Sequence, residues 1–165
     1  MVNRNRVLAS LGLVLLIWGL WYFFPGRQRQ VKRQLKALAS WATKEPGEGA
    51  LAAAQTAREA REYFADPCTW TAEAFELSGK VSADEISQYM FAARSRFESL
   101  AVKFYDPVID FQDDGSALVT ATVRVQGTQR DGDPVNETHE VRCTMTEEDG
   151  TWRIAKVTVV EVLKR

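Results

Sequence analysis

The spacing of apolar residues changes twice along the 165-residue chain. Residues 7–24 carry no charge and form one apolar run. Through most of residues 27–97 the apolar positions recur three or four apart, and from residue 98 onward they recur at every second position. A period near 3.6 predicts amphipathic helices, whereas a period of two predicts strands with one buried face. The pattern therefore predicts an apolar segment, then helices, then a sheet.

The apolar run Val7–Phe24 is long enough to cross a bilayer. As a helix, its 18 residues would rise about 27 Å, close to the roughly 30 Å of bilayer hydrocarbon. Trp18, Trp21 and Tyr22 crowd its C-terminal end, and such rings favour the membrane–water interface. The run exceeds the roughly 7–15 apolar residues of a cleaved signal peptide. We expect residues 1–26 to form a short tail and an uncleaved transmembrane anchor.

Three helices are predicted after the anchor. An apolar stripe runs along residues 27–44, and a face of small residues runs along about residues 49–65, which favours a packed helical hairpin. Residues 75–77 form a candidate short strand. Ser82 and Glu85 then have the spacing of a capping box, which begins a third helix. Arg94, near its end, is explained by stabilisation of the helix C-terminus.

Four consecutive strands are predicted from residue 98 to residue 163. Asp-Asp-Gly at 113–115 and Glu-Asp-Gly at 148–150 are turn signals between them. The apolar parity flips at Asp106-Pro107, which indicates a bulge or bend. It flips again in the last strand, where a second bulge or burial of both faces would explain it. Strands joined by short turns pair antiparallel. The fold class predicted is therefore α+β, with three helices on a sheet of about four main strands.

Charge is segregated along the chain although the formal net charge is −1. Residues 45–165 carry 13 Lys and Arg against all 22 Asp and Glu, a net charge of −9. Such a domain does not suit nucleic acid, because phosphate binding needs a basic face. The basic juxtamembrane stretch 27–44 has no acid and can lie against anionic lipid headgroups. Its cations are Arg27, Arg29, Lys32, Arg33, Lys36 and Lys44.

Two cysteines, Cys68 and Cys143, lie far apart, with no Cys-x-x-Cys and no zinc-ligand spacing. In a reducing compartment they are two buried thiols, and in an oxidising one a disulfide becomes favourable.

The positive-inside count places the domain in the cytoplasm, whereas the short charged tail before the apolar run favours its export. We expect a single-pass inner-membrane protein with a periplasmic domain and a Cys68–Cys143 disulfide.

The segment GKVSADEISQYMFAARSRFESLAVKFYDPVIDFQDDGSALVTATVRVQG (79–127) resembles the third helix, long bent strand and hairpin partner of the NTF2-like, or SnoaL-like, superfamily. TWRIAKVTVVEVL (151–163) resembles its last strand. The resemblance covers about residues 27–163 and implies a cone, in which the helices pack on a curved antiparallel sheet. An anchor followed by such a domain also resembles the bitopic NTF2-like assembly factors of bacterial type IV secretion and conjugation.

The resemblance also implies where chemistry would lie. Enzymes of the superfamily often place an Asp/His or Tyr/Asp pair inside the cone, where burial tunes proton transfer. His139 is the single histidine and shares the strand parity of Val141 and Cys143, while Asp106, at the strand interruption, is the candidate partner. The plain alternatives are a structural histidine at the rim and an Asp-Pro turn. No phosphate-binding loop or metal-ligand cluster is present, so no cofactor or metal is predicted.

Two hypotheses follow. The first is a non-catalytic, membrane-anchored domain that docks a membrane or periplasmic protein, or a second copy of itself. The second is a ligand-binding or catalytic cone that uses His139. The predicted anchor favours the first, because tethering raises the effective concentration of a partner at the membrane.

Overall fold

The structure is a computed structural model that describes residues 26–72 and 77–160. The chain divides into two units, Met1–Val31 and Lys32–Arg165, and the second contains the domain described below. The predicted anchor Val7–Phe24 lies outside the described residues. Among the helices that the structure does describe, none combines the length and the apolar character that a membrane span requires.

Four helices are described, and one of them is a single turn. They are α2 (Arg27–Ala42), α3 (Ala50–Arg58), α4 (Ala60–Tyr63) and α5 (Ala83–Arg96). The predicted capping box of α5 is present, since the backbone N–H of Ser82 donates to Glu85 Oε2 at 2.7 Å and the N–H of Glu85 donates to Ser82 Oγ at 3.2 Å. These bonds satisfy two amides that a helix N-terminus leaves open. The backbone N–H and the hydroxyl of Ser82 both donate to the Glu85 carboxylate and lower its pKa.

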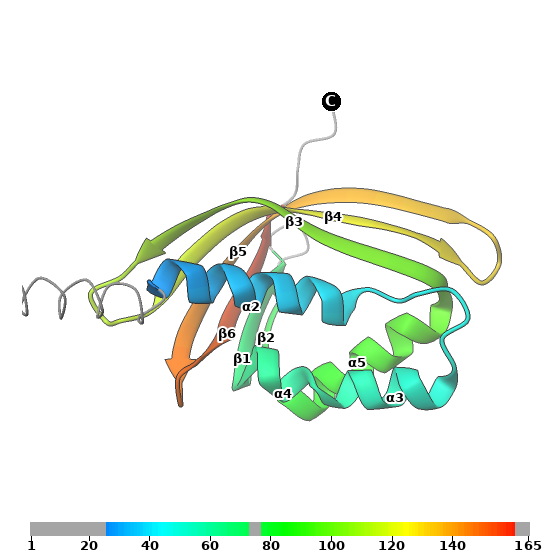
Figure 1. The fold of residues 1–165 in the computed structure, drawn as a ribbon, viewed down its shortest axis with the longest axis horizontal. Coiled ribbons are helices and arrows are strands. Elements are labelled where there is room, and N and C mark those ends of the chain that lie inside the picture. Colours follow the sequence, from blue (N-terminus) through cyan, green and yellow to red (C-terminus); the bar gives the residue numbers. More distant parts are fainter. Residues whose placement is uncertain (1–25, 73–76, 161–165) are drawn as a thin grey trace, which may run out of the picture. The chain divides into compact units, whose positions relative to one another are not determined.

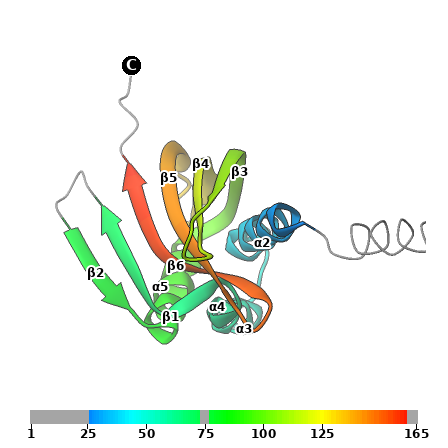
Figure 2. The same cartoon turned by 90° about the vertical axis from the view of Figure 1, so that its left-hand side faces the viewer.

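The helices pack on one six-stranded sheet (Figures 1 and 2). Its strands are β1 (Phe64–Ala72), β2 (Leu77–Val81), β3 (Phe97–Phe111), β4 (Ala117–Gln129), β5 (Pro134–Glu148) and β6 (Thr151–Val160). They lie in the order β2-β1-β6-β5-β4-β3, with β1 parallel to β6 and every other pair antiparallel. Figure 2 shows the sheet curling around the helices. The predicted α+β class and cone are therefore present.

The prediction of about four strands was wrong, because β1 and β2 extend the sheet beyond β6. The second helix, expected to reach about residue 65, ends at Tyr63, and Phe64 already pairs with Ile154 of β6. Pro67 has no backbone N–H and cannot sit inside a helix. The chain there instead continues along the open edge of β6, which supplies the backbone hydrogen bonds that an extended segment needs.

Both predicted changes of strand parity coincide with irregularities in the sheet. The register between β3 and β4 shifts between Tyr105 and Val108, and Asp106 takes a left-handed conformation with φ 48°. The register between β5 and β6 shifts between Thr144 and Met145, which identifies a bulge as the cause of the second flip. Each bulge bends its strand, which helps the sheet to curve around the helices.

The core lies between the concave face of the sheet and the helices. Every second residue of β4 from Ala117 to Val123 is buried, and the alternate residues face away. Trp152 and Met145 are among the largest fully buried side chains. The rings of Trp152 and Phe111 pack edge to face, with their centroids 5.9 Å apart. Burial of side chains of this size stabilises the fold by about 1.5–3 kcal/mol each.

The edge of the sheet at β3 is partly covered by the chain itself. Lys44 N donates to Leu100 O at 2.6 Å, and Leu100 N donates to Lys44 O at 3.0 Å. On the opposite side of β3, Gly127 faces Leu100 so closely that a Cβ there would come within 2.4 Å of Ser99 O. The loop after α2 thus occupies backbone groups at an edge that would otherwise be open to pairing with another chain.

Candidate functional site

The predicted acid–base pair is not brought together in the cone. His139 Nε2 lies 3.1 Å from Glu137 Oε2, and the histidine side chain is 37% exposed. Asp106, the expected partner, lies at the bulge of β3 with its side chain exposed. Residues two apart on a strand share a face, so strand alternation alone could have indicated the Glu137–His139 pair, which we did not predict. The structure therefore places His139 at an open part of the inner face.

The two cysteines are free in the structure, which corrects the expected Cys68–Cys143 disulfide. Cys68 is on β1 and Cys143 on β5, with β6 between them. Two strand spacings put their backbones about 10 Å apart, beyond the roughly 7 Å Cα separation that a disulfide spans. Burial raises the pKa of the Cys68 thiol to about 11, and burial together with the charge of Cys68 raises that of Cys143 to about 12. Both thiols are thus protonated and unreactive near neutral pH.

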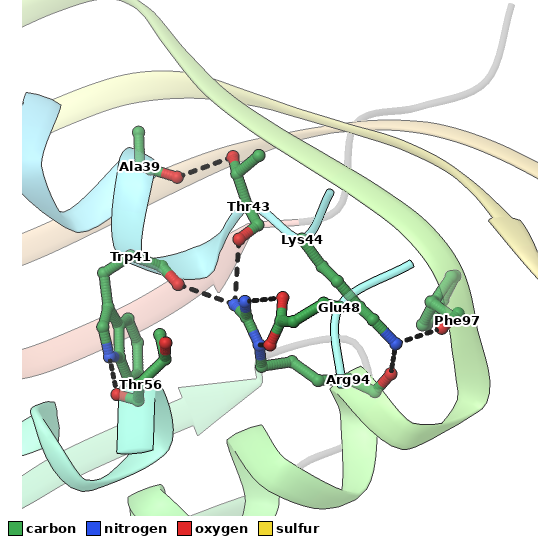
Figure 3. A network of polar contacts seen from close by, with 8 residues as sticks. All are labelled: Ala39, Trp41, Thr43, Lys44, Glu48, Thr56, Arg94 and Phe97. Atoms are coloured by element: carbon green, nitrogen blue, oxygen red, sulfur yellow. Dashed lines mark hydrogen bonds and ion pairs between the residues drawn. The ribbon is translucent and has the colours of Figure 1, made fainter. Parts of the chain in front are cut away.

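The largest buried charge cluster lies where α5 passes into β3 (Figure 3). Arg94 has only 3% of its surface exposed, and its guanidinium forms a two-pronged ion pair with Glu48 through Nε and Nη2. Its Nη1 also donates to the carbonyl oxygens of Trp41 and Thr43, at 2.8 and 2.9 Å. One side chain therefore ties α5 to the loop between α2 and α3.

Lys44, 5% exposed, completes this cluster. Its Nζ donates to the carbonyl oxygens of Arg94 at 2.8 Å and Phe97 at 2.7 Å. These oxygens belong to the last turn of α5 and the first residue of β3, where a helix leaves carbonyls unpaired and carries partial negative charge. We call Lys44, Glu48 and Arg94 the corner cluster.

The corner cluster serves structure more readily than chemistry. Four N–H bonds of Arg94 and two of Lys44 are directed at the chain's own carbonyls and at Glu48. A group that acts on a substrate needs a donor or acceptor directed into a space that the substrate can enter. Within the described residues, no group of three or more His, Cys, Asp or Glu side chains is placed to hold a metal ion.

The predicted basic stretch lies on α2, and its side chains are exposed. These are Arg27, Arg29, Lys32, Arg33 and Lys36. Lys44, the last cation of that stretch, is the exception, because it lies in the corner cluster. Lys44 is therefore committed to contacts inside the fold, whereas Arg29, Lys32, Arg33 and Lys36 lie on the exposed surface of α2.

The convex side of the sheet is a face that none of the described helices covers (Figure 2). In register across the sheet, Val108, Thr120, Arg142 and Thr158 form one row, and Asp110, Leu118, Thr144 and Lys156 form the next. Their parity is opposite to that of the buried core residues. We call these eight residues the outer face. Five of its side chains are uncharged and mostly half-buried, and Asp110, Arg142 and Lys156 carry charges of both signs.

The comparisons with known proteins identify the domain. Residues 49–158 match the family model described as the SnoaL-like domain. The chain belongs to this family. The match spans α3 to most of β6, so it includes most of the helices and nearly the whole sheet. No curated protein sequence matches the chain significantly.

Solved structures show the same fold at low sequence identity. A protein assigned as a scytalone dehydratase from Novosphingobium aromaticivorans is 13% identical, with a TM-score of 0.67 over 82% of this chain and 84% of that one. An NTF2-like superfamily protein from Salmonella enterica is 12% identical, with a TM-score of 0.58 over 82% and 88%. The CaMKII hub of S. rosetta is 18% identical, with a TM-score of 0.55 over 82% and 93%. At these identities the likeness shows the SnoaL-like, NTF2-like fold alone.

Proposed function

We propose that this SnoaL-like domain is a non-catalytic docking module, held at the bacterial inner membrane by Val7–Phe24 with the domain in the periplasm. Its partner is a protein at the membrane, and the partner nearest at hand is a second copy of the chain. The observation that carries this proposal is the uncovered outer face. A face of this kind, on which a few charges of both signs lie among uncharged side chains, suits association with a complementary protein surface.

The symmetry of the outer face favours self-association. Two identical faces related by a twofold axis meet as one self-complementary patch. Within one copy, Arg142 Nη2 lies 3.4 Å from Glu140 Oε1. The CaMKII hub among the similar structures is, by its name, a hub domain of the same fold. That likeness supports an assembly role for this chain.

The buried charges support a non-catalytic role. The corner cluster bonds to backbone carbonyls, and His139 pairs with an exposed carboxylate that the solvent can screen. Acid–base catalysis needs a base, a group that orients it, and an enclosed site near both. The described residues supply the first two at His139 and Glu137, on an open part of the sheet.

The proposal is tested by adding charge to the outer face of the full chain in detergent. We expect Thr120→Lys with Thr144→Lys to convert the wild-type dimer into a monomer, as measured by light scattering coupled to chromatography. The matched control is Leu51→Lys with Tyr89→Lys, which places the same charges on residues that are 75% and 63% exposed on the helices.

In cells, a photo-crosslinking residue at position 120 should link to the second copy or to another membrane protein. A wild-type chain that is monomeric in detergent, and that also forms no crosslink from position 120 in cells, would contradict the docking role. Equal loss of the dimer in the control variant would show that the outer face is not the surface responsible.

The second candidate function is a ligand-binding or catalytic cone, and the Glu137–His139 pair is the observation that favours it. A carboxylate 3.1 Å from an imidazole can hold its tautomer and support a proton transfer. The scytalone dehydratase assigned in Novosphingobium aromaticivorans shows that the name of an enzyme is attached to this fold. If this function holds, His139→Gln abolishes activity in the cell while leaving the dimer and its crosslinks intact.

A further inference from the structure

A groove runs between the exposed side of α2 and the bulged part of β3. Its volume is about 350 Å³, at the lower end of the roughly 300–1,000 Å³ of small-ligand sites. Leu35 and Pro107 contribute apolar surface to its lining, and the ring of Tyr105, 41% exposed, stands beside them. Lys32, Lys36 and Lys103 also line the groove, together with Ala39 and Phe104.

The three lysines are an unusual combination for a surface groove. Lys32 and Lys36 lie one helical turn apart on α2, where like charges repel, and Lys103 adds a third cation from β3. Within the described part of the chain, no ion pair involves any of the three, and no carboxylate lines the groove. Asp106, next to the groove in sequence, has its side chain exposed outside the lining. The groove therefore presents concentrated positive charge over an apolar floor.

The fold places these residues together for identifiable reasons. Lys32, Leu35, Lys36 and Ala39 are three or four positions apart and therefore share one face of α2, on which Leu35 is buried and the two lysines are exposed. Tyr105 and Pro107 flank the left-handed Asp106 at the bulge of β3, and both line the groove. Bulges of this kind re-aim side chains.

We propose that this groove binds the headgroup of an anionic phospholipid and docks the domain against the membrane surface. Lysine ammonium groups bind phosphate as point charges, their stems cover apolar surface, and a tyrosine favours the boundary between apolar and wet surroundings. The groove thus matches a phosphate joined to a glycerol and acyl carbons better than it matches a free inorganic anion, which would leave the apolar floor unused.

The inference rests on the tether of the proposed function. Lys32 follows Phe24 by eight residues, so a chain anchored through Val7–Phe24 keeps the groove beside the bilayer. The attraction of an anionic leaflet falls off within a Debye length of about 8 Å. Each lysine within that distance strengthens binding by about fivefold.

The experiment uses the full chain reconstituted into phosphatidylcholine vesicles with and without phosphatidylglycerol. A fluorophore is attached through Ser40→Cys, since Ser40 is exposed on α2 next to Ala39 of the groove lining, and both native cysteines are buried. A trace of headgroup-nitroxide phosphatidylcholine in both vesicles quenches the fluorophore when it approaches the surface. We expect several-fold stronger quenching with phosphatidylglycerol, and a decline as salt is added.

Lys32→Gln, Lys36→Gln and Lys103→Gln together should reduce the quenching to the level in phosphatidylcholine alone. The matched control, Arg58→Gln with Lys80→Gln and Arg96→Gln, removes the same charge from exposed positions on α3, β2 and α5 and should keep the quenching. Equal quenching in both kinds of vesicle, or equal loss of quenching in the two triple variants, would contradict lipid binding by the groove. It would not contradict the membrane anchor at Val7–Phe24. If the chain does not co-float with either kind of vesicle in a density gradient, the proposed membrane anchor is contradicted, and so is lipid binding by the groove.

Discussion

Two groups of cations meet β3, and they have opposite surroundings. Arg94 and Lys44 of the corner cluster are at most 5% exposed, and their N–H groups are directed at carbonyl oxygens and at Glu48. Lys32, Lys36 and Lys103 of the groove carry the same kind of charge, yet the structure gives them no internal ion pair among the described residues.

The difference lies in the acceptors that each position offers. At the corner, the last turn of α5 presents unpaired carbonyls to Lys44, and the loop after α2 presents two more to Arg94. A buried cation is tolerated only when it is fully bonded in this way. At the groove, solvent stabilises the charge, so the site remains available to an external anion. Buried charge therefore fixes the fold here, and exposed charge is left for a partner.

The strongest way to break this contrast is to remove the guanidinium at the corner. Arg94→Met would leave the Glu48 carboxylate and the carbonyl oxygens of Trp41 and Thr43 without their donor, at positions where water has little access. We expect a loss of about 3–5 kcal/mol in the free energy of unfolding, measured by denaturant titration.

The double variant Arg94→Met with Glu48→Leu sharpens the same point. It removes both charges, so the uncompensated carboxylate is gone, and the double variant should be more stable than Arg94→Met alone. A double variant whose loss equals the sum of the two single losses would contradict the view that the ion pair acts as one unit.

A smaller effect is expected at the second corner cation. Lys44→Met keeps most of the aliphatic stem but leaves the carbonyl oxygens of Arg94 and Phe97 unpaired, which costs about 2 kcal/mol. Lys103→Met, the matched change at the groove, should alter the free energy of unfolding by less than about 0.5 kcal/mol. Equal effects of the two changes in the same denaturant titration would erase the contrast between the regions.

The part of the fold that depends on periodicity could be predicted from the sequence. The capping box at Ser82, the bulge at Asp106-Pro107 and the four-strand meander all show in local patterns of a few residues. The strand β1 could not, because it pairs in parallel with β6, some 87–90 positions away. Only the alternation of Cys68 and Trp70 with Thr69 and Thr71 hinted at a strand there. Of the candidate short strand at residues 75–77, only Leu77 is described, and it is the first residue of β2.

The sites were harder to predict, because they join residues distant in sequence. The sequence predicted only that Arg94 stabilises the C-terminus of its helix. Its partners Trp41 and Glu48 lie about 50 positions earlier in the chain. Lys103 looked like an ordinary outward residue of a strand, and nothing local indicated that α2 would place Lys32 and Lys36 beside it. Only the Glu137–His139 pair, two residues apart on one strand, could have been predicted from local sequence.

The smallest expected effect concerns the groove and is informative because it is small. Replacing Lys32, Lys36 and Lys103 with Gln removes three mutually repelling charges that take part in no ion pair within the described residues. In the absence of anionic lipid, the free energy of unfolding should therefore change by less than about 0.5 kcal/mol per site, with any net change toward greater stability. Salt screens that repulsion, so the difference between variant and wild type should shrink as salt is added. Denaturant titrations at low and high salt measure both effects. A loss of about 2 kcal/mol or more would show that these lysines hold the fold together as Lys44 does, and the contrast between the two groups of cations would then fail.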